Sequence, residues 1–190
     1  MTAEYLLAHD LGTTGDKATL FNTEGELLAS SYLEYPTVYP EPTWAEQNPN
    51  DWWNAFVAAT KSLLSKSKIS PKDILGLSFS GQMLGCLPVE ENGVPLRASI
   101  IWMDQRSVKQ AELIRNRVGE EHYYRTTGNR ISPTYSISKI LWLRENQPAI
   151  YERAYKFLQA KDYIIYRLTG RFVTDYSDAS LAGMLDVNRR

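Results

Sequence analysis

The chain has 190 residues, of which 43% are hydrophobic and 23% charged, and its formal net charge is −1. These values are ordinary for a globular protein with a buried core, and they exclude a disordered chain. The single cysteine, Cys86, excludes an internal disulfide, and the two widely separated histidines argue against a zinc site. No apolar run is long enough to cross a bilayer, so we expect a cytoplasmic protein with no membrane partner.

Charge is distributed unevenly along the sequence. Residues 1–50 hold eight acidic residues and one basic residue, whereas residues 104–190 hold fifteen basic and ten acidic residues. Solvated surfaces explain such a difference, and an anion held by the second part is the functional alternative. The basic residues are scattered and follow no nucleic-acid recognition motif, so we expect no nucleic-acid partner.

Hydrophobic patterning predicts strands first and helices later. In chain order we expect strands over 5–9, 18–22 and 26–33, an ordered loop over 36–49, a helix from 49, a turn over 70–73 and a strand over 74–79. After these we expect a hairpin over 84–97, a short strand over 100–102, and helices that cover 108–118, 137–143 and 161–168. This order predicts an α/β fold, with helices packed on a sheet.

The segment 10–17 follows the first strand and contains Gly12, Thr13 and Thr14. Glycine lets a backbone approach a phosphate closely, and peptide N–H groups, threonine hydroxyls and the Lys17 ammonium are donors that suit an anion. Asp10 at the strand end can hold a hydrated Mg²⁺. The segment is neither a Walker loop nor a GxGxxG fingerprint, and a plain hairpin turn is the alternative.

Two further segments, 80–85 and 102–106, have polar side chains where a predicted strand ends. Small molecules often bind at this end of the strands in α/β sheets. In the first, Gln82 suits hydroxyl groups because its amide can both donate and accept. In the second, Trp102 and Asp104 form a combination that can hold a sugar. The alternatives are a tight turn capped by Gln82, and a core Trp102 followed by a helix-capping Asp104. Asp175, Asp178 and Asp186 could pair for acid–base chemistry, although such residues are usually solvated.

Taken together and in this order, several segments resemble the N-terminal domain of the FGGY carbohydrate kinases, and among these the xylulokinases in particular. The resemblance runs from about Tyr5 to Val187. The segments that carry it are Asp10–Thr14, Trp44–Pro49, Asp51–Trp53, Ser80–Met83, Ile101–Arg106, Thr127–Asn129, Lys139–Trp142, Lys161–Tyr163 and Thr174–Ser180.

The resemblance implies a ribonuclease-H-like mixed sheet flanked by helices, as in the actin-like ATPase superfamily. It implies that residues 1–190 are a sugar-kinase N-terminal domain, incomplete at its C-terminal end, and that a second, adenosine-binding domain is absent from this chain. The implied reaction transfers the γ-phosphoryl group of ATP to a hydroxyl of a pentulose-type sugar, with ATP and Mg²⁺. The implied partners are the sugar, ATP and the missing C-terminal domain, and a homodimer is a further possibility.

The resemblance also assigns roles to individual residues. Asp10 corresponds to the carboxylate close to the metal and the phosphate, which holds the metal through water. Phosphate contacts correspond to Gly12, Thr13, Thr14 and Lys17. Substrate contacts correspond to Gln82, Met83, Leu84, Trp102 and Asp104. The general base of the family lies beyond Arg190, so we expect the 190-residue chain to be inactive alone.

One departure leaves the sugar open. Xylulokinases usually have a histidine at position 84, where this chain has Leu84, and the Arg-Glu pair of glycerol kinases at positions 83 and 84 is absent. A non-catalytic sugar-binding or interaction module is the alternative function, because no general base is assigned. An actin-like assembly protein is a third possibility, and the loops around Gln82 and Trp102 argue against it.

Overall fold

The computed structural model describes residues 4–189, which form two compact units. The first, here called the sheet unit, contains the residues up to Thr37 together with Asn50–Gln82. The second, here called the helical unit, contains Val38–Pro49 and the residues from Met83 onward. Among residues 4–189, no helix combines the length and the apolar character needed to span a membrane.

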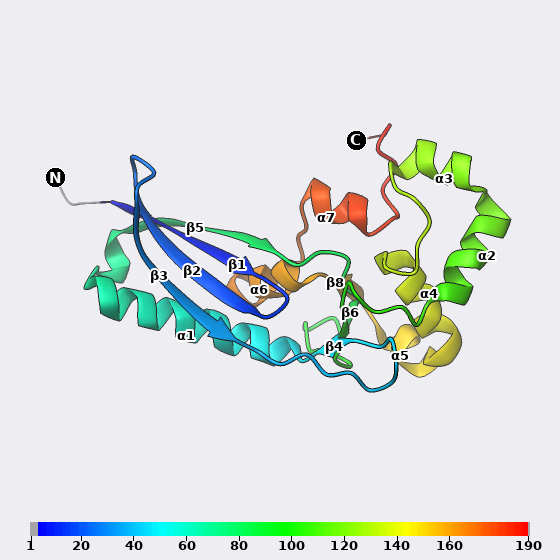
Figure 1. Cartoon of the computed structure of the whole chain (residues 1–190), viewed down its shortest axis with the longest axis horizontal. Helices are drawn as coiled ribbons and strands as arrows, with labels where there is room; N and C mark the ends of the chain where they lie inside the picture. Colours follow the sequence, from blue (N-terminus) through cyan, green and yellow to red (C-terminus); the bar gives the residue numbers. More distant parts are fainter. Residues whose placement is uncertain (1–3, 190) are drawn as a thin grey trace. The chain divides into compact units, whose positions relative to one another are not determined.

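The sheet unit consists of a four-stranded sheet and one long helix (Figure 1). Its strands are β1 (Tyr5–Leu11), β2 (Gly15–Asn22), β3 (Leu27–Glu34) and β5 (Ile74–Gly81), in the spatial order β3-β2-β1-β5. The strands β1, β2 and β3 pair antiparallel, whereas β5 pairs parallel to β1. The result is the mixed sheet that the sequence predicts.

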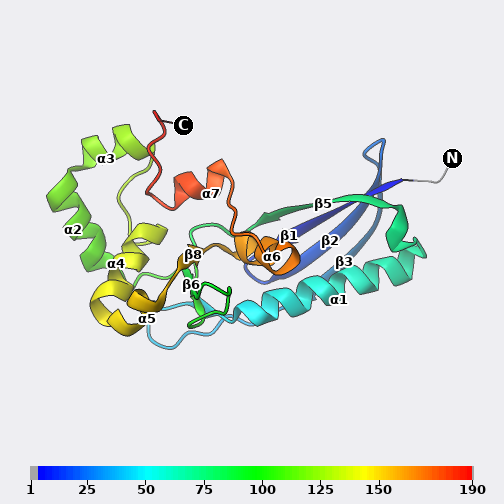
Figure 2. The ribbon, with the colours of Figure 1, turned by 180° about the vertical axis from the view of Figure 1, so that it is seen from behind.

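The helix α1 (Pro49–Ser67) covers one face of this sheet, as both views of the ribbon show (Figures 1 and 2). Ala59 and Leu63 of α1 pack against a cluster from the strands that includes Leu7 and Leu20. Proline at the first helical position begins the helix, because its missing N–H would have no partner there. The 3₁₀ turn η1 (Pro71–Asp73) then leads into β5.

A buried polar pair lies within the core of the sheet unit. His9 on β1 and Asp16 on β2 are both almost fully buried, and His9 Nδ1 lies 2.7 Å from Asp16 Oδ2. The other ring nitrogen lies 3.2 Å from the Thr60 hydroxyl on α1. His9 therefore has a structural position between the sheet and its helix, since buried polar groups need partners.

The helical unit is built around α4 (Ser136–Asn146). One cluster on this helix packs Ile140 and Leu143 against Cys86 and Ile100, and a second packs Ile137 and Leu141 against α2 and the segment that follows α3. The remaining helices are α2 (Val108–Val118), α3 (Glu120–Thr127), α5 (Pro148–Arg153), α6 (Ala160–Thr169) and α7 (Tyr176–Leu181). Two small sheets pair β4 (Glu46–Gln47) with β7 (Ser99–Ile100), and β6 (Leu87–Val89) with β8 (Lys156–Leu158).

The sequence predictions hold for the main elements, with errors in element bounds, in the pairing of one hairpin and in short elements that were missed. The predicted strands at 5–9 and 18–22 are longer in the structure, and the short strand predicted over 100–102 is shifted to Ser99–Ile100. The 84–97 hairpin forms only at its tip, where Val89 bridges Pro95, because β6 pairs with the distant strand β8. Five short elements were not predicted, namely β4, α3, α5, β8 and α7.

Candidate functional site

A polar row crosses the sheet on the face opposite to α1. In the pairing register Asp10 lies between Lys17 of β2 and Ser80 of β5, and Lys17 is opposite Tyr32 of β3. Asp10 is exposed, and its Oδ1 accepts a hydrogen bond of 2.7 Å from the Ser80 hydroxyl. Because residues paired across neighbouring strands face the same side of a sheet, Asp10, Lys17, Ser80 and Tyr32 lie together near the carboxyl end of β1.

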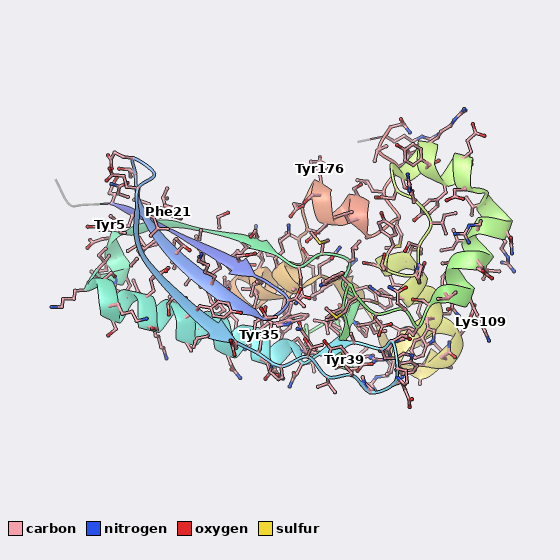
Figure 3. The ribbon with its side chains drawn as sticks, in the orientation of Figure 1. Tyr5, Phe21, Tyr35, Tyr39, Lys109 and Tyr176 are labelled. Atoms are coloured by element: carbon pink, nitrogen blue, oxygen red, sulfur yellow. The ribbon has the colours of Figure 1, made fainter. Side chains whose placement is uncertain are left out.

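The turn between β1 and β2 is held at the carbonyl of Gly12. The Tyr35 hydroxyl donates to this oxygen over 2.5 Å, and Nε2 of Gln82 lies 3.4 Å from it. The N–H of Gly12 donates to the carbonyl of Gly15. Tyr35 follows β3 directly and is labelled in Figure 3. The turn therefore has a fixed shape before any ligand binds.

The hydroxyl of Tyr35 stays protonated over the whole physiological range. Burial, together with the nearby Asp16 carboxylate, raises the pKa of Tyr35 above its ordinary value. A protonated phenol is a good donor, as the short bond to Gly12 requires. On the exposed side of the turn, the Thr14 hydroxyl lies 2.9 Å from the hydroxyl of Tyr32. The hydroxyls of Thr13 and Thr14 and the ammonium of Lys17 belong to this turn and to the strand after it, and donors of these kinds suit an anion.

In the helical unit, two loops leave a β-bridge in the same direction. Cys86 and Ile100 exchange backbone hydrogen bonds of 2.9 and 3.1 Å as antiparallel partners. The residues before Cys86 and those after Ile100 therefore extend to the same side. Met83 and Trp102 each expose about two fifths of their surface, at 42% and 39% respectively. Leu84 has a φ of 63°, in the left-handed region that few leucines adopt.

Asp104 has a different environment from the one that the sequence predicts. It is fully buried and forms a two-bond ion pair with the Arg106 guanidinium, whose Nη2 lies 2.7 Å from Asp104 Oδ2. The same carboxylate accepts from the backbone N–H of Ala45 and of Arg106. Its oxygens are therefore used within the protein, and they hold the loop that carries Trp102.

The Arg106 guanidinium is the centre of this arrangement. It lies 3.8 Å above the Trp44 ring and 5.0 Å from that of Trp142, and its Nη1 is 2.7 Å from a Glu46 oxygen. Stacking of this kind suits arginine, whose planar ion is weakly hydrated. No sequence pattern predicts this role for Arg106, although Arg106 belongs to a segment that carries the family resemblance.

The structure groups the sequence-predicted residues by unit. Asp10, Gly12, Thr13, Thr14, Lys17 and Gln82 gather at one edge of the sheet unit. Met83, Leu84, Trp102 and Asp104 belong to two adjacent loops of the helical unit. Gln82 is 7% exposed and bonds to the turn after β1, so its amide orders the turn. Direct contact of these residues with a substrate stays a prediction.

Metal binding by this chain would depend on Asp10. Residues 4–189 contain no group of three or more histidine, cysteine, aspartate or glutamate side chains placed to hold an ion. Mg²⁺ keeps several waters and commonly binds through one or two carboxylates together with substrate phosphates. A single exposed carboxylate fits that kind of ion, and the hydroxyl and ammonium groups near it suit the phosphate that would accompany the ion.

Comparison with known proteins supplies the family. The profile described as "FGGY family of carbohydrate kinases, N-terminal domain" matches residues 5–190. The chain belongs to this family. A xylulose kinase from Bacillus subtilis is 34% identical over 187 residues, and a glycerol kinase from Thermococcus gammatolerans is 33% identical over 189 residues. These matches cover 98% and 97% of this chain but only 37% and 38% of the relatives.

Solved structures agree with the fold of this FGGY-family chain. A ligand-bound xylulose kinase from Lactobacillus acidophilus has a TM-score of 0.90 at 31% identity, covering 98% of this chain and 37% of that one. The predicted fold class, a mixed sheet flanked by helices as in this family of kinases, is confirmed. The chain spans little more than a third of the length of these relatives.

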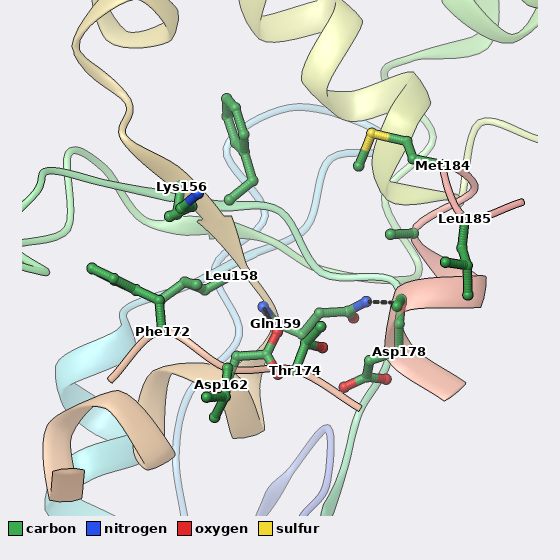
Figure 4. Close-up of a pocket in the computed structure, with 13 residues that line it drawn as sticks. Lys156, Leu158, Gln159, Asp162, Phe172, Thr174, Asp178, Met184 and Leu185 are labelled. Atoms are coloured by element: carbon green, nitrogen blue, oxygen red, sulfur yellow. Dashed lines mark hydrogen bonds between the residues drawn. The ribbon is translucent and has the colours of Figure 1, made fainter. Parts of the chain in front are cut away.

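A pocket of about 390 Å³ lies in the helical unit, between β8, α6 and α7 (Figure 4). Its walls are mainly apolar, and Asp162 and Asp178 contribute buried carboxyl groups. The Gln159 side chain bonds to the carbonyl of Asp178, as the dashed line shows. Asp175, which the sequence grouped with Asp178, begins α7 and is paired with Lys161, so these carboxylates have structural roles.

We predict that the free energy of unfolding falls between about pH 4 and 6, because the buried Asp162 carboxyl group loses its proton in this range. Burial raises its pKa to about 6, against the opposite effect of the Gln159 N–H bond. The folded state therefore holds this proton more strongly than the unfolded state. Its stabilising effect is complete below about pH 4 and is lost as pH passes 6.

Urea unfolding of the wild type and of Asp162→Asn measures this effect, since asparagine keeps an acceptor for the Gln159 N–H. Between pH 4 and 6.5 the wild type should lose about 2–3 kcal/mol relative to the variant. A stability difference that does not change with pH would contradict the prediction.

Proposed function

We propose that this chain is the N-terminal, sugar-binding part of an ATP-dependent carbohydrate kinase. The reaction would transfer the γ-phosphoryl group of ATP to a hydroxyl of a pentulose-type sugar. The observation that carries the proposal is the ordered turn after β1, where Asp10, Lys17 and two threonines offer a carboxylate and anion donors at one edge of the sheet. Phosphoryl transfer depends mainly on positioning and charge neutralisation, which such groups supply.

The proposal includes a Mg²⁺ ion, which Asp10 would hold through a bound water. When bound, Mg²⁺ would neutralise phosphate charge. The Ser80 hydroxyl donates to Asp10 and so fixes the direction of its carboxylate. Lys17, its neighbour in the register, would attract phosphate oxygens.

The substrate class is supported by relatives that include several xylulose kinases. A similar identity to a glycerol kinase shows that family membership alone does not determine the acceptor. In our proposal the exposed Met83 and Trp102 contact the sugar, and Leu84 adjusts the preference between pentuloses. A polyol substrate is less favoured, since the Arg-Glu pair of glycerol kinases is missing at positions 83 and 84.

The coverage of the relatives supports the domain organisation that we propose. A chain that matches little more than a third of each kinase leaves room for a second domain, to which we assign the adenosine site. We place the general base in the part of the kinase that follows residue 190. In the proposal the enzyme is cytoplasmic, where ATP is available, and its homodimer stays a prediction.

The test of the proposal is a panel of sugars assayed with the 190-residue chain and with the complete kinase. We expect the complete kinase to consume ATP with D-xylulose or D-ribulose. We expect the chain alone to bind the same sugar in a calorimetric titration without turning over ATP. Turnover by the chain alone would refute its predicted inactivity, and a complete protein inactive with every sugar would refute the kinase function.

If Asp10 holds the metal, its removal should lower phosphotransfer by the complete kinase much more than sugar binding. Asp10→Ala should lower kcat by about 100- to 1,000-fold, the usual cost of removing one electrostatic contact to a transition state. Sugar affinity should change little, because in our proposal Asp10 acts on the metal and the phosphate, whereas Met83 and Trp102 contact the sugar. Glu24→Ala, in the exposed β2–β3 turn, is the control. Equal loss of sugar affinity and of phosphotransfer would argue against the metal role.

The substitution Leu84→His should raise the activity of the complete kinase with D-xylulose. Histidine tolerates the left-handed backbone better than leucine, so Leu84→His should fold without added strain. One new hydrogen bond to the sugar corresponds to about a fivefold rise in kcat/KM for D-xylulose. Kinetics of the complete kinase with D-xylulose and D-ribulose measure this rise. If neither value changes, the side chain at position 84 faces away from the sugar.

A further inference from the structure

A fully buried lysine lies beneath the loop that carries Met83 and Leu84. Lys139 has no exposed surface, and its Nζ donates two hydrogen bonds of 2.6 Å. The acceptors are the backbone carbonyls of Leu84 and Thr134. Lysine is rarely buried unless something in the fold uses its charge or its donors.

Side chains form hydrogen bonds with the backbone of the loop at two successive residues, Leu84 and Gly85. The Lys139 ammonium donates to the carbonyl of Leu84, and the Ser136 hydroxyl donates to the carbonyl of Gly85 over 2.7 Å. The N–H of Gly85 donates to Oε1 of Gln159 over 3.1 Å. Ser136 and Gln159 are also buried, at 4% and 5% exposure. We call Ser136, Lys139 and Gln159 the loop cradle.

One turn of helix supplies most of the loop cradle. Ser136 is the first residue of α4 and Lys139 lies three residues later, so both side chains are on the same face. Gln159 lies at the junction between β8 and α6, and its side chain also donates to the carbonyl of Asp178 (Figure 4). Side chains from two segments distant in sequence, α4 and the β8–α6 junction, thus converge on two residues of one loop.

Keeping a cation here has an energetic cost. Burial lowers the pKa of Lys139 to about 7, against the raising effects of the nearby Cys86 and Asp104. The Arg106 guanidinium also faces it and favours the neutral form. An apolar side chain of the same length would avoid the desolvation, but it would leave two buried carbonyls without these donors.

The geometry of Leu84 explains why such support is needed. Its φ of 63° is an unfavourable conformation for a leucine, and it persists only if the surroundings hold it. The carbonyl that Lys139 takes belongs to this same residue. Without the bond, the loop could relax to a commoner backbone conformation and turn Met83 away from its present direction.

We propose that Lys139 is a positioning residue for the sugar loop, and that it acts with Ser136 and Gln159 by holding Leu84 and Gly85 in the conformation that presents Met83 and Leu84 to the substrate. The inference rests on the proposed function for its sugar ligand. The holding of the loop itself does not depend on what binds there.

The test compares Lys139→Met and Ser136→Ala with Ser138→Ala. Ser138 is the matched control, because it is buried on the same helix and also donates to a carbonyl, that of Ser132 and not one in the loop. Amide exchange at Gly85 and Cys86 in the 190-residue chain measures how firmly the loop is held. The sugar KM, the ATP KM and kcat of the complete kinase measure the consequence for binding.

We expect faster exchange at Gly85 in both loop-cradle variants and unchanged exchange in Ser138→Ala. The sugar KM should rise by about tenfold in Lys139→Met and about fivefold in Ser136→Ala, with little change in the ATP KM. If Lys139→Met does not fold, Ser136→Ala decides the question with the same control. The proposal is overturned if the loop-cradle variants and Ser138→Ala behave alike in exchange and in sugar KM.

The two hypotheses fail in different ways. A wild-type protein that binds and phosphorylates no sugar refutes the proposed function, and faster exchange at Gly85 would then still support the holding of the loop by Lys139. A wild type that phosphorylates sugar, with variants of unchanged exchange and unchanged sugar KM, refutes the role of Lys139 and leaves the kinase function intact.

Discussion

The parallel pairing of β1 with β5 is the constraint on which the candidate site depends. Because the two strands run in the same direction, their carboxyl ends meet, and Asp10 and Ser80 become neighbours across 70 residues of sequence. The same pairing brings Gln82 to the carbonyl of Gly12, where Tyr35 also donates. The turn after β1 is therefore ordered by the protein alone, and a ligand that binds there does not have to order it.

The helical unit fixes its loops with buried charge. Arg106 and Asp104 form a pair beneath the Trp102 loop, and the Lys139 ammonium takes the carbonyl of Leu84. Buried ions of this kind add little to stability, because desolvation offsets much of their attraction. Their value in this unit is directional, since the Asp104 carboxylate and the Lys139 ammonium bond to particular backbone groups and so select one loop conformation. The cost in stability is the reason to connect these ions with a function.

Much of the fold could be predicted from the sequence because apolar residues recur at strand or helix spacing over long segments, as in α1 and α2. The missed elements lack such a signal. The strand β8 has three residues, and α5 and α7 have six each, so neither period can be recognised. The site was predicted in part for a related reason. Asp10 and Trp102 belong to local motifs, whereas the contacts of Tyr35 and the burial of Asp104 depend on partners distant in sequence.

The left-handed conformation of Leu84 has a consequence for how this protein family can diversify. At most positions a substitution that alters ligand preference also disturbs packing, so specificity and stability change together. At Leu84 the backbone already disfavours the resident side chain, and glycine, asparagine, aspartate or histidine would each fit the same φ more easily. In our proposal Leu84 contacts the sugar, so a lineage could change its acceptor through this position while the backbone strain at residue 84 falls.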